Sequence, residues 1–217
     1  MKIAAYVLGS LVVLVLAYWF LARPWYARWG ATVDELAMQL PGDAIVPDAN
    51  MVSTRAVTVH APAAQIYPWL VQIGQGRGGM YSYEWIENLI GCDMHNVYQI
   101  VPDLQNVQAG QIIRMGPEGY PMYRVDSFAA GRYFVVRPGD PKTHEPGPGS
   151  WAMVLNERPD GTTRMILRQR MRVDPGIGNF VLWRVLVDPI TFVMEQKMMR
   201  SIRDLATQSA GLASAGR

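Results

Sequence analysis

The stretch of sequence that decides the fold runs from residue 150 to residue 173 and reads SWAMVLNERPDGTTRMILRQRMRV. Two short runs, residues 150–157 and 163–173, flank the pair Asp160-Gly161, which is a strong signal for a hairpin turn. Three similar runs precede this hairpin: QIIRM (111–115), YRVDSF (123–128) and RYFVVRP (132–138). Short runs that are separated by turn residues predict an antiparallel meander.

The segments around this meander predict one more strand and three helices. Residues 53–60 (STRAVTVH) are β-branched and alternate in character, which predicts a half-buried strand. Residues 63–73 and 83–90 have helical spacing, and Pro68 should bend the first of these helices. Residues 188–206 carry apolar side chains on one face and predict a long amphipathic helix. Its charged residues fall mostly on other faces: Glu195, Lys197, Arg200 and Arg203. Because a sheet and its helices must bury the faces that meet, this order predicts an α+β domain.

The chain also contains several longer motifs. They are WGAT (29–32), LPGD (40–43), TRAVTVHAP (54–62), WLVQIGQGRGGMYSYEWIENLIGC (69–92), IVPDLQ (100–105), SWAMVL (150–155) and FVMEQKMM (192–199). Together they resemble the START-like, polyketide-cyclase and pollen-allergen superfamily (SRPBCC), and within it a bacterial, membrane-anchored subfamily. The resemblance implies a helix-grip fold, in which a curved antiparallel sheet wraps around the long C-terminal helix and leaves an apolar cavity between them. Fold transfers better than function, because this superfamily includes binders, carriers and cyclases.

The N-terminal run from residue 3 to residue 22 reads IAAYVLGSLVVLVLAYWFLA and contains no charge. A helix of this length spans the ~30 Å hydrocarbon core of a bilayer, so the run predicts a transmembrane anchor. Arg23 and Arg28 follow it and can reach phosphate headgroups. An aromatic belt at the interface is predicted from five residues: Tyr18, Trp19, Trp25, Tyr26 and Trp29. A cleaved signal peptide is the alternative, but its apolar core is about 7–15 residues long, which is shorter than this run.

These patterns divide the chain into an anchor (1–28), a juxtamembrane helix and linker (29–50), one helix-grip domain (51–209) and a disordered tail (210–217). Within the second part, Thr32 and Glu35 have the spacing of a helix-capping box, and Pro41-Gly42 ends that helix. Basic residues nearly balance across the anchor, with Lys2 on one side and Arg23 and Arg28 on the other. We expect a single-pass protein of the cell membrane with its domain on the cytoplasmic side.

Composition argues against several partners. The net charge is +2 and the sequence contains no block of like charges, so we expect no nucleic-acid interface.

Cys92 is the single cysteine, which excludes an intramolecular disulfide and suits a reducing compartment. Cys92 and His95 are close in sequence, but they are too few for a zinc site and no third group orients them as a nucleophile and base. We therefore expect a buried thiol, no metal and no cofactor.

The segment Gly74–Gly79 (GQGRGG) contains four glycines and Arg77. A phosphate-binding loop is disfavoured, because the glycines follow a helix and no Lys-Ser or Lys-Thr pair closes the segment. A tight turn with positive φ is the simpler interpretation. A third possibility is that Arg77 faces the mouth of the cavity and pairs with a carboxylate or phosphate of a ligand.

Two further groups bear on the chemistry of the cavity. Glu84 is the best candidate for an acid–base group, because the aromatic residues around it in the sequence can make its surroundings apolar. It is nevertheless a weak candidate. Four arginines alternate along the last strand and so share one face: Arg164, Arg168, Arg170 and Arg172. We interpret them as the solvated outer face of the sheet, since four uncompensated arginines would be costly inside a cavity. The residues between them then point inward, with Gln169 as a polar group.

We therefore expect the domain to bind a hydrophobic small molecule or lipid that it takes from the bilayer, with an unknown protein partner and no catalytic residue assigned. The expected walls of the cavity are Trp85, Trp151, Met153 and Met194, and the expected polar groups are Arg77, Tyr83, Glu84 and Gln169. Two alternatives stay open. One is a cyclase- or aromatase-like enzyme that uses the same cavity, and the other is an interaction module without a cavity. A volume well below ~300 Å³ would favour the module.

Overall fold

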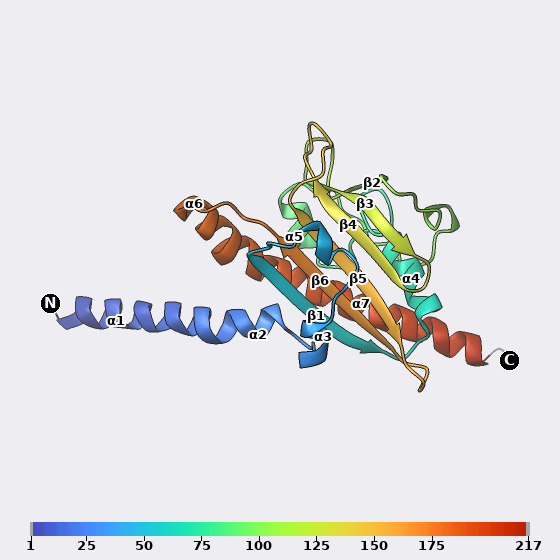
Figure 1. Cartoon of the computed structure of the whole chain (residues 1–217), viewed down its shortest axis with the longest axis horizontal. Coiled ribbons are helices and arrows are strands. Elements are labelled where there is room, and N and C mark those ends of the chain that lie inside the picture. Colours follow the sequence, from blue (N-terminus) through green and yellow to red (C-terminus); the bar gives the residue numbers. More distant parts are fainter. Residues whose placement is uncertain (1, 216–217) are drawn as a thin grey trace.

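The computed structural model describes the backbone of residues 2–215, and the side chains of residues 1–5, 8, 11, 12 and 212–217 lie outside the described part. Six strands form one antiparallel sheet in the order β1-β6-β5-β4-β3-β2 (Figure 1). The strands are β1 (Met51–Val59), β2 (Ile112–Arg114), β3 (Met122–Ala129), β4 (Tyr133–Gly139), β5 (Gly149–Glu157) and β6 (Thr163–Met171). The predicted meander is confirmed, and the predicted upstream strand pairs with its last strand.

A long helix, α7 (Asp188–Ala215), lies along the inner face of the curved sheet (Figure 1). It continues a helical segment that begins with α6 (Ile177–Asn179) and a π-helical stretch, η4 (Phe180–Val187). The connection between β1 and β2 contains three short helices: α4 (Ala63–Val71), α5 (Glu84–Leu89) and the 3-10 turn η3 (Pro102–Leu104). The fold is therefore α+β, with the helix-grip arrangement of a sheet around a C-terminal helix.

The main core fills the space between the inner face of the sheet, α4 and α7. Fully buried side chains come from each of these elements, for example Ile66 on α4, Met165 on β6 and Ile202 on α7. Alternation along β1 places Val57 and Val59 on this face, as period-two geometry requires. Valine, isoleucine, leucine and alanine side chains make up most of this core, and methionines and aromatic residues fill the spaces between them.

The outer face of the sheet is covered as well, by the segment from residue 29 to residue 48. Thr32 and Glu35 form the predicted capping box at the start of α3 (Val33–Ala37). After α3 the chain passes Leu40 and a 3-10 turn, η2 (Asp43–Ile45). Leu40 packs in a second core with outward-facing residues of four strands: Ala56, Val135, Ala152, Val154 and Ile166.

This cover corrects the interpretation of the arginines as a solvated face for Arg164, Arg168 and Arg170 of β6, whereas Arg172, just after β6, is exposed. They do share the outer face, but they bind the covering segment. Arg164 forms a two-point ion pair with Glu35, at 2.7 Å for each contact. Arg168 donates to Asp43 and to three backbone carbonyls of the same segment. Arg170 and Arg172 reach the stretch Val46–Asp48. Burial raises the pKa of Glu35, but hydrogen bonds from Arg164 and Thr32 outweigh it and hold that pKa below its usual range.

The N-terminal helix is continuous through α1 (Lys2–Ala17), the π-helical η1 (Tyr18–Ala22) and α2 (Arg23–Ala27), and α1 extends away from the domain (Figure 1). Its described large side chains up to residue 16 are apolar and exposed. Among the residues whose side chains are described, one helix is long and apolar enough to cross a membrane, and it is Ile177–Gly211 at the other end of the chain. Part of the run 3–22 lies outside that description.

The C-terminal tail differs from its predicted disorder, because α7 continues to Ala215. This stretch is rich in alanine, and alanine has the highest helix propensity, so a helix can extend beyond its packed part. The last two predicted tail residues, 216 and 217, lie outside the described part.

Candidate functional site

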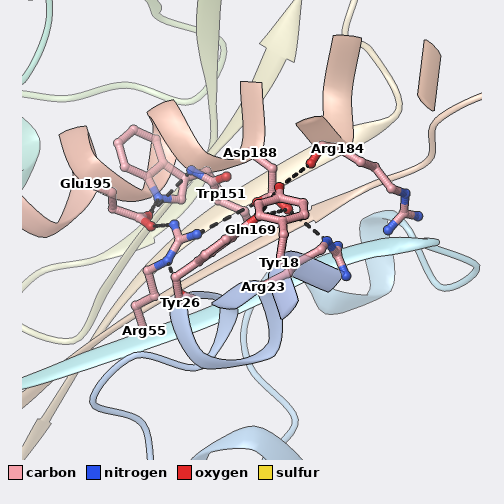
Figure 2. A network of polar contacts seen from close by, with 9 residues as sticks. All are labelled: Tyr18, Arg23, Tyr26, Arg55, Trp151, Gln169, Arg184, Asp188 and Glu195. Atoms are coloured by element: carbon pink, nitrogen blue, oxygen red, sulfur yellow. Dashed lines mark hydrogen bonds and ion pairs between the residues drawn. The ribbon is translucent and has the colours of Figure 1, made fainter. Parts of the chain in front are cut away.

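A buried polar network lies where β1, the start of α7 and the N-terminal helix meet (Figure 2). Arg55 is its centre. Because it shares the inner face of β1 with Val57 and Val59, its side chain is carried into the core and is fully buried. Its guanidinium forms an ion pair with Glu195 and donates from Nε to the carbonyl of Tyr26 at 2.9 Å.

Glu195 is the acceptor that joins α7 to the sheet. Its Oε1 accepts a hydrogen bond from Nε1 of Trp151 on β5 at 2.8 Å, and Nε2 of Gln169 on β6 lies 3.5 Å from the same oxygen (Figure 2). The other oxygen, Oε2, takes the ion pair from Arg55. One carboxylate therefore connects three strands to the long helix.

Asp188 joins the N-terminal helix to the same network. Its carboxylate lies 3.2 Å from Nε of Arg23 and accepts a hydrogen bond from the hydroxyl of Tyr26 at 3.2 Å (Figure 2). Arg55 lies 4.0 Å from its other oxygen. Next to it, the ring of Phe192 stacks on Tyr26 with 5.3 Å between centroids. Burial, and then Tyr18 and Asp188, raise the pKa of Tyr26, so the phenol keeps its proton and stays a donor.

In the buried centre of the network, the cations of Arg23 and Arg55 lie against the carboxylates of Asp188 and Glu195. Burial of charges is costly unless they are paired and hydrogen-bonded, and here each carboxylate has both kinds of contact. The network is thus a polar floor inside an otherwise apolar core, and it fixes the N-terminal helix to the domain.

A small pocket opens beside this floor and has a volume of about 40 Å³. Asp188, Trp151 and Gln169 belong to both the pocket and the network. The remaining wall comes from the ends of β1, β4, β5 and β6 and from one residue of β3: Met51, Val52, Ser53, Tyr123, Pro138, Gly149, Ser150, Arg170 and Met171. Burial, and then the charge of Glu195, raise the pKa of Tyr123 to about 12. The volume is far below the ~300 Å³ that a drug-sized ligand needs, so the expected large cavity between sheet and helix is absent among the described residues.

The predicted binding residues divide into two groups. Trp151 and Gln169 lie at the pocket and in the network, where Gln169 is the polar group that was expected. Met153 is fully buried in the main core and does not line the pocket. Met194 is half-buried, and its sulfur accepts from the hydroxyl of Ser82 at 3.4 Å.

Arg77 does not face the pocket. Its guanidinium donates to the carbonyls of Ile73, Val71 and Leu104 at 3.1, 2.9 and 3.3 Å, so it closes the end of α4. Burial lowers the pKa of this side chain. The glycines around it form the tight turn that the second interpretation required, because Gly74, Gly76 and Gly79 all have positive φ.

The α5 region also lies away from the pocket. Trp85 is 65% exposed and Tyr83 is 36% exposed, so neither forms the wall of a cavity. Glu84 accepts a hydrogen bond from the backbone N–H of Asn96. The more perturbed group is its neighbour Glu87, whose pKa is raised to about 7 by burial and then by the charge of Glu84. The nearby thiol of Cys92 is buried, as expected, and burial followed by Glu87 raises its pKa.

Three residues of the network were not identified from the sequence: Arg55, Asp188 and Glu195. The signal was nevertheless present. Glu195 stands three residues after Phe192 and four before Met199, which is the spacing of the buried face of α7, and Arg55 alternates with Val57 on β1. A charge at a core position of an amphipathic pattern predicts a buried partner.

A second, open groove of about 360 Å³ lies beside the N-terminal helix. Its walls come from α2, α3 and β1: Arg23, Pro24, Ala27, Arg28, Leu36, Val52 and Thr54. In the described part of the chain, no group of three or more His, Cys, Asp or Glu side chains is placed to hold a metal ion.

Comparison with known proteins gave structural matches alone: neither the known protein families nor the curated proteins match this sequence. Solved structures with a similar fold include protein MLL2253 from Mesorhizobium loti (12% identity, 73% of this chain and 98% of that one, TM-score 0.40). They also include Ara h 8.0201 (10%, 73% and 98%, 0.40) and the Aha1 dimer from Colwellia psychrerythraea (10%, 68% and 93%, 0.39). The assignment of the fold rests on the strand order and on the position of α7.

Proposed function

We propose that this chain is a single-pass membrane-anchored domain that binds a hydrophobic small molecule or the apolar part of a lipid between its sheet and the start of α7. The observation that carries this proposal is the position of the pocket. Asp188 lines it, and the same carboxylate is paired with Arg23 of the N-terminal helix. A molecule that leaves the bilayer beside that helix would have a short path to the pocket.

The tether is proposed from the N-terminal run. Its described side chains from Tyr6 to Leu16 are apolar and exposed, and water is an unfavourable solvent for such a surface. Trp25 is also exposed, at the level where an interfacial belt is expected. The proposal includes a cytoplasmic position for the domain, because the single buried thiol of Cys92 suits a reducing compartment.

Binding requires the pocket to open, because about 40 Å³ holds one or a few water molecules but no drug-sized ligand. The natural movement is a displacement of η4 and the start of α7 from the ends of β1, β5 and β6. Ser53, Gln169 and Tyr123 would then offer polar contacts to one end of the ligand, with the methionines Met51 and Met171 around its apolar part.

A second candidate function is supported by the small volume itself. A domain whose sheet and helix are packed together would act as an interaction module, presenting its surface to another membrane protein. The enzyme alternative has less support, because Glu84 is bound to the backbone of Asn96 and is not among the residues of the pocket.

Native mass spectrometry of the full chain, released from lipid nanodiscs after expression in a bacterium, tests the proposal. We expect an apolar adduct that Ser53→Leu, which fills the pocket, removes. The matched control is Trp85→Ala, whose side chain is exposed on α5 and away from the pocket. An unmodified mass, together with no uptake from added lipids and isoprenoids, would assign the interaction module instead.

A further inference from the structure

The helical segment ahead of α7 exposes an unusually apolar surface. Residues 177–187, IGNFVLWRVLV, contain a single charged residue, Arg184. The exposed apolar side chains range from 42% to 86% exposed: Ile177, Phe180, Val181, Leu182, Val185 and Leu186. Single exposed apolar residues are common on proteins in water, whereas a contiguous patch of this kind marks a surface that another apolar medium covers.

This segment touches the N-terminal helix. The hydroxyl of Tyr18 donates to the carbonyl of Arg184 at 2.6 Å, and the ring of Trp19 stacks on Phe180 with 5.3 Å between centroids. α1 and α6 project from the same side of the domain (Figure 1). Lipid around the end of α1 would therefore also surround the exposed side of η4.

The part of this helix that is free of the domain is too short for a second crossing of the bilayer. The apolar helix Ile177–Gly211 is long enough to span, but from Asp188 onward it is held in the domain, where Asp188, Phe192 and Glu195 are buried. The free part is three residues of α6 and eight of η4. At 1.5 Å per residue it reaches roughly 16 Å, about half of the hydrocarbon core.

The polar groups of the segment fit partial insertion. The guanidinium of Arg184 turns back to the domain and donates to the carbonyl of Asn50. The carboxylate of Asp174, in the turn before α6, is the acidic group that would oppose deep insertion. We infer that residues 177–186 enter the membrane beside the anchor, as a second lipid-contacting element that does not cross the bilayer. This inference rests on the proposed tether. Two contacts with the membrane would hold the domain in one orientation, with its pocket toward the lipid.

Site-specific fluorescence in phosphatidylcholine vesicles tests the inference on the full chain. In a Cys92→Ala background, a single cysteine at Leu182→Cys carries an environment-sensitive fluorophore. The matched control is Gln208→Cys, which is exposed farther along the same helix. Lipids brominated in their acyl chains should quench roughly half of the emission at position 182 and leave position 208 unchanged. Asp174→Asn should increase the quenching at position 182, because it removes the opposing charge.

Failure of the proposed insertion can be distinguished from failure of the proposed tether. One outcome is that an aqueous quencher reaches the label at position 182, while an alkaline wash leaves the chain in the vesicles. In that case the insertion of residues 177–186 is wrong and the proposed tether stands. If the chain is washed off, both are wrong. If the label is shielded from the lipid and the aqueous quencher alike, a second copy or another protein covers the segment, and the inference is overturned.

Discussion

Arg55 carries a charge into the centre of the fold, where burial of an unpaired charge would be costly. Its environment works as a set: Glu195 neutralises it, the carbonyl of Tyr26 accepts from it, and its guanidinium lies over the ring of Phe192 at 5.3 Å. These contacts fix how α7 packs against β1, and loss of one residue leaves its partners buried without that contact.

Glu195→Gln should therefore destabilise the domain strongly, since it leaves Arg55 buried without its charge partner. Breaking a buried ion pair from one side costs about 3–5 kcal/mol of unfolding free energy. Denaturant unfolding of the full chain in detergent micelles measures the loss. The matched control is Glu118→Gln, an exposed residue for which no change is expected. Equal unfolding midpoints for the two variants would show that the network contributes nothing to stability.

Glu87 should make stability depend on pH. Its folded-state pKa of about 7 lies above its ordinary value of 4.5, so the folded chain binds a proton more tightly than the unfolded chain. The contribution of this group is fully present below pH 4.5 and is lost as the pH rises through 7. The loss is about 1–2 kcal/mol, with allowance for screening by solvent.

The variant Glu87→Gln keeps the shape and removes the titration, so this decline between acid and neutral pH should disappear. Unfolding midpoints of the parent and the variant across that pH range provide the measurement. Parallel pH profiles of the two chains would contradict the assigned pKa.

At the scale of elements, the arginines of β6 explain why both faces of the sheet are covered. The guanidinium of Arg168 donates to the carboxylate of Asp43 and to the backbone carbonyls of the covering segment at Glu35, Leu36 and Met38. Arg168→Met should free the segment 32–46 from the sheet and cost about 2–4 kcal/mol. Hydrogen exchange of that segment should rise, while Arg158→Met, at an exposed position, should leave it protected. Unchanged protection in the first variant would refute the role of the arginine.

Much of this architecture could be predicted from the sequence. Turn residues and alternation located the meander, and the Thr32–Glu35 spacing gave the capping box, because these signals are local. Two features could not be obtained in this way. Sequence alone does not say what covers the outer face of a strand, so Arg164 and its neighbours were interpreted as solvated. Likewise, the spacing of Glu195 is compatible with a charged face until its partner Arg55, 140 residues away, is known.

Of the residues expected to form the binding site, two on strands lie at the pocket, and those in the long connection before β2 do not. Trp151 and Gln169 line the pocket because they point inward on strands, and alternation fixes which residues do so. Arg77, Tyr83 and Trp85 belong to the long connection before β2, whose course depends on tertiary contacts. No local pattern fixes on which side of the domain such a connection places its side chains.

For the whole molecule, the N-terminal helix and the domain form one packed unit. Tyr26 is 4% exposed and bonds Asp188, while its ring packs on Phe192. A fragment that begins at Ala31 lacks Tyr26 and Arg23, so Asp188 and Arg55 would lose partners and Phe192 would be uncovered. We expect this fragment to unfold at a lower denaturant concentration than the full chain and to aggregate. Equal midpoints would show that the helix is only a tether.

The most direct test of the central claim is photo-crosslinking with a lipid that carries a diazirine at the end of its acyl chain. The full chain in vesicles is irradiated, and the modified residues are mapped by mass spectrometry. If the pocket binds lipid, we expect adducts on its wall, at Met51, Trp151 or Met171, in addition to adducts on the proposed anchor. Adducts confined to the anchor and to the exposed α5 residues Trp85 and Leu89 would contradict it, because the lipid would then never enter between the sheet and α7.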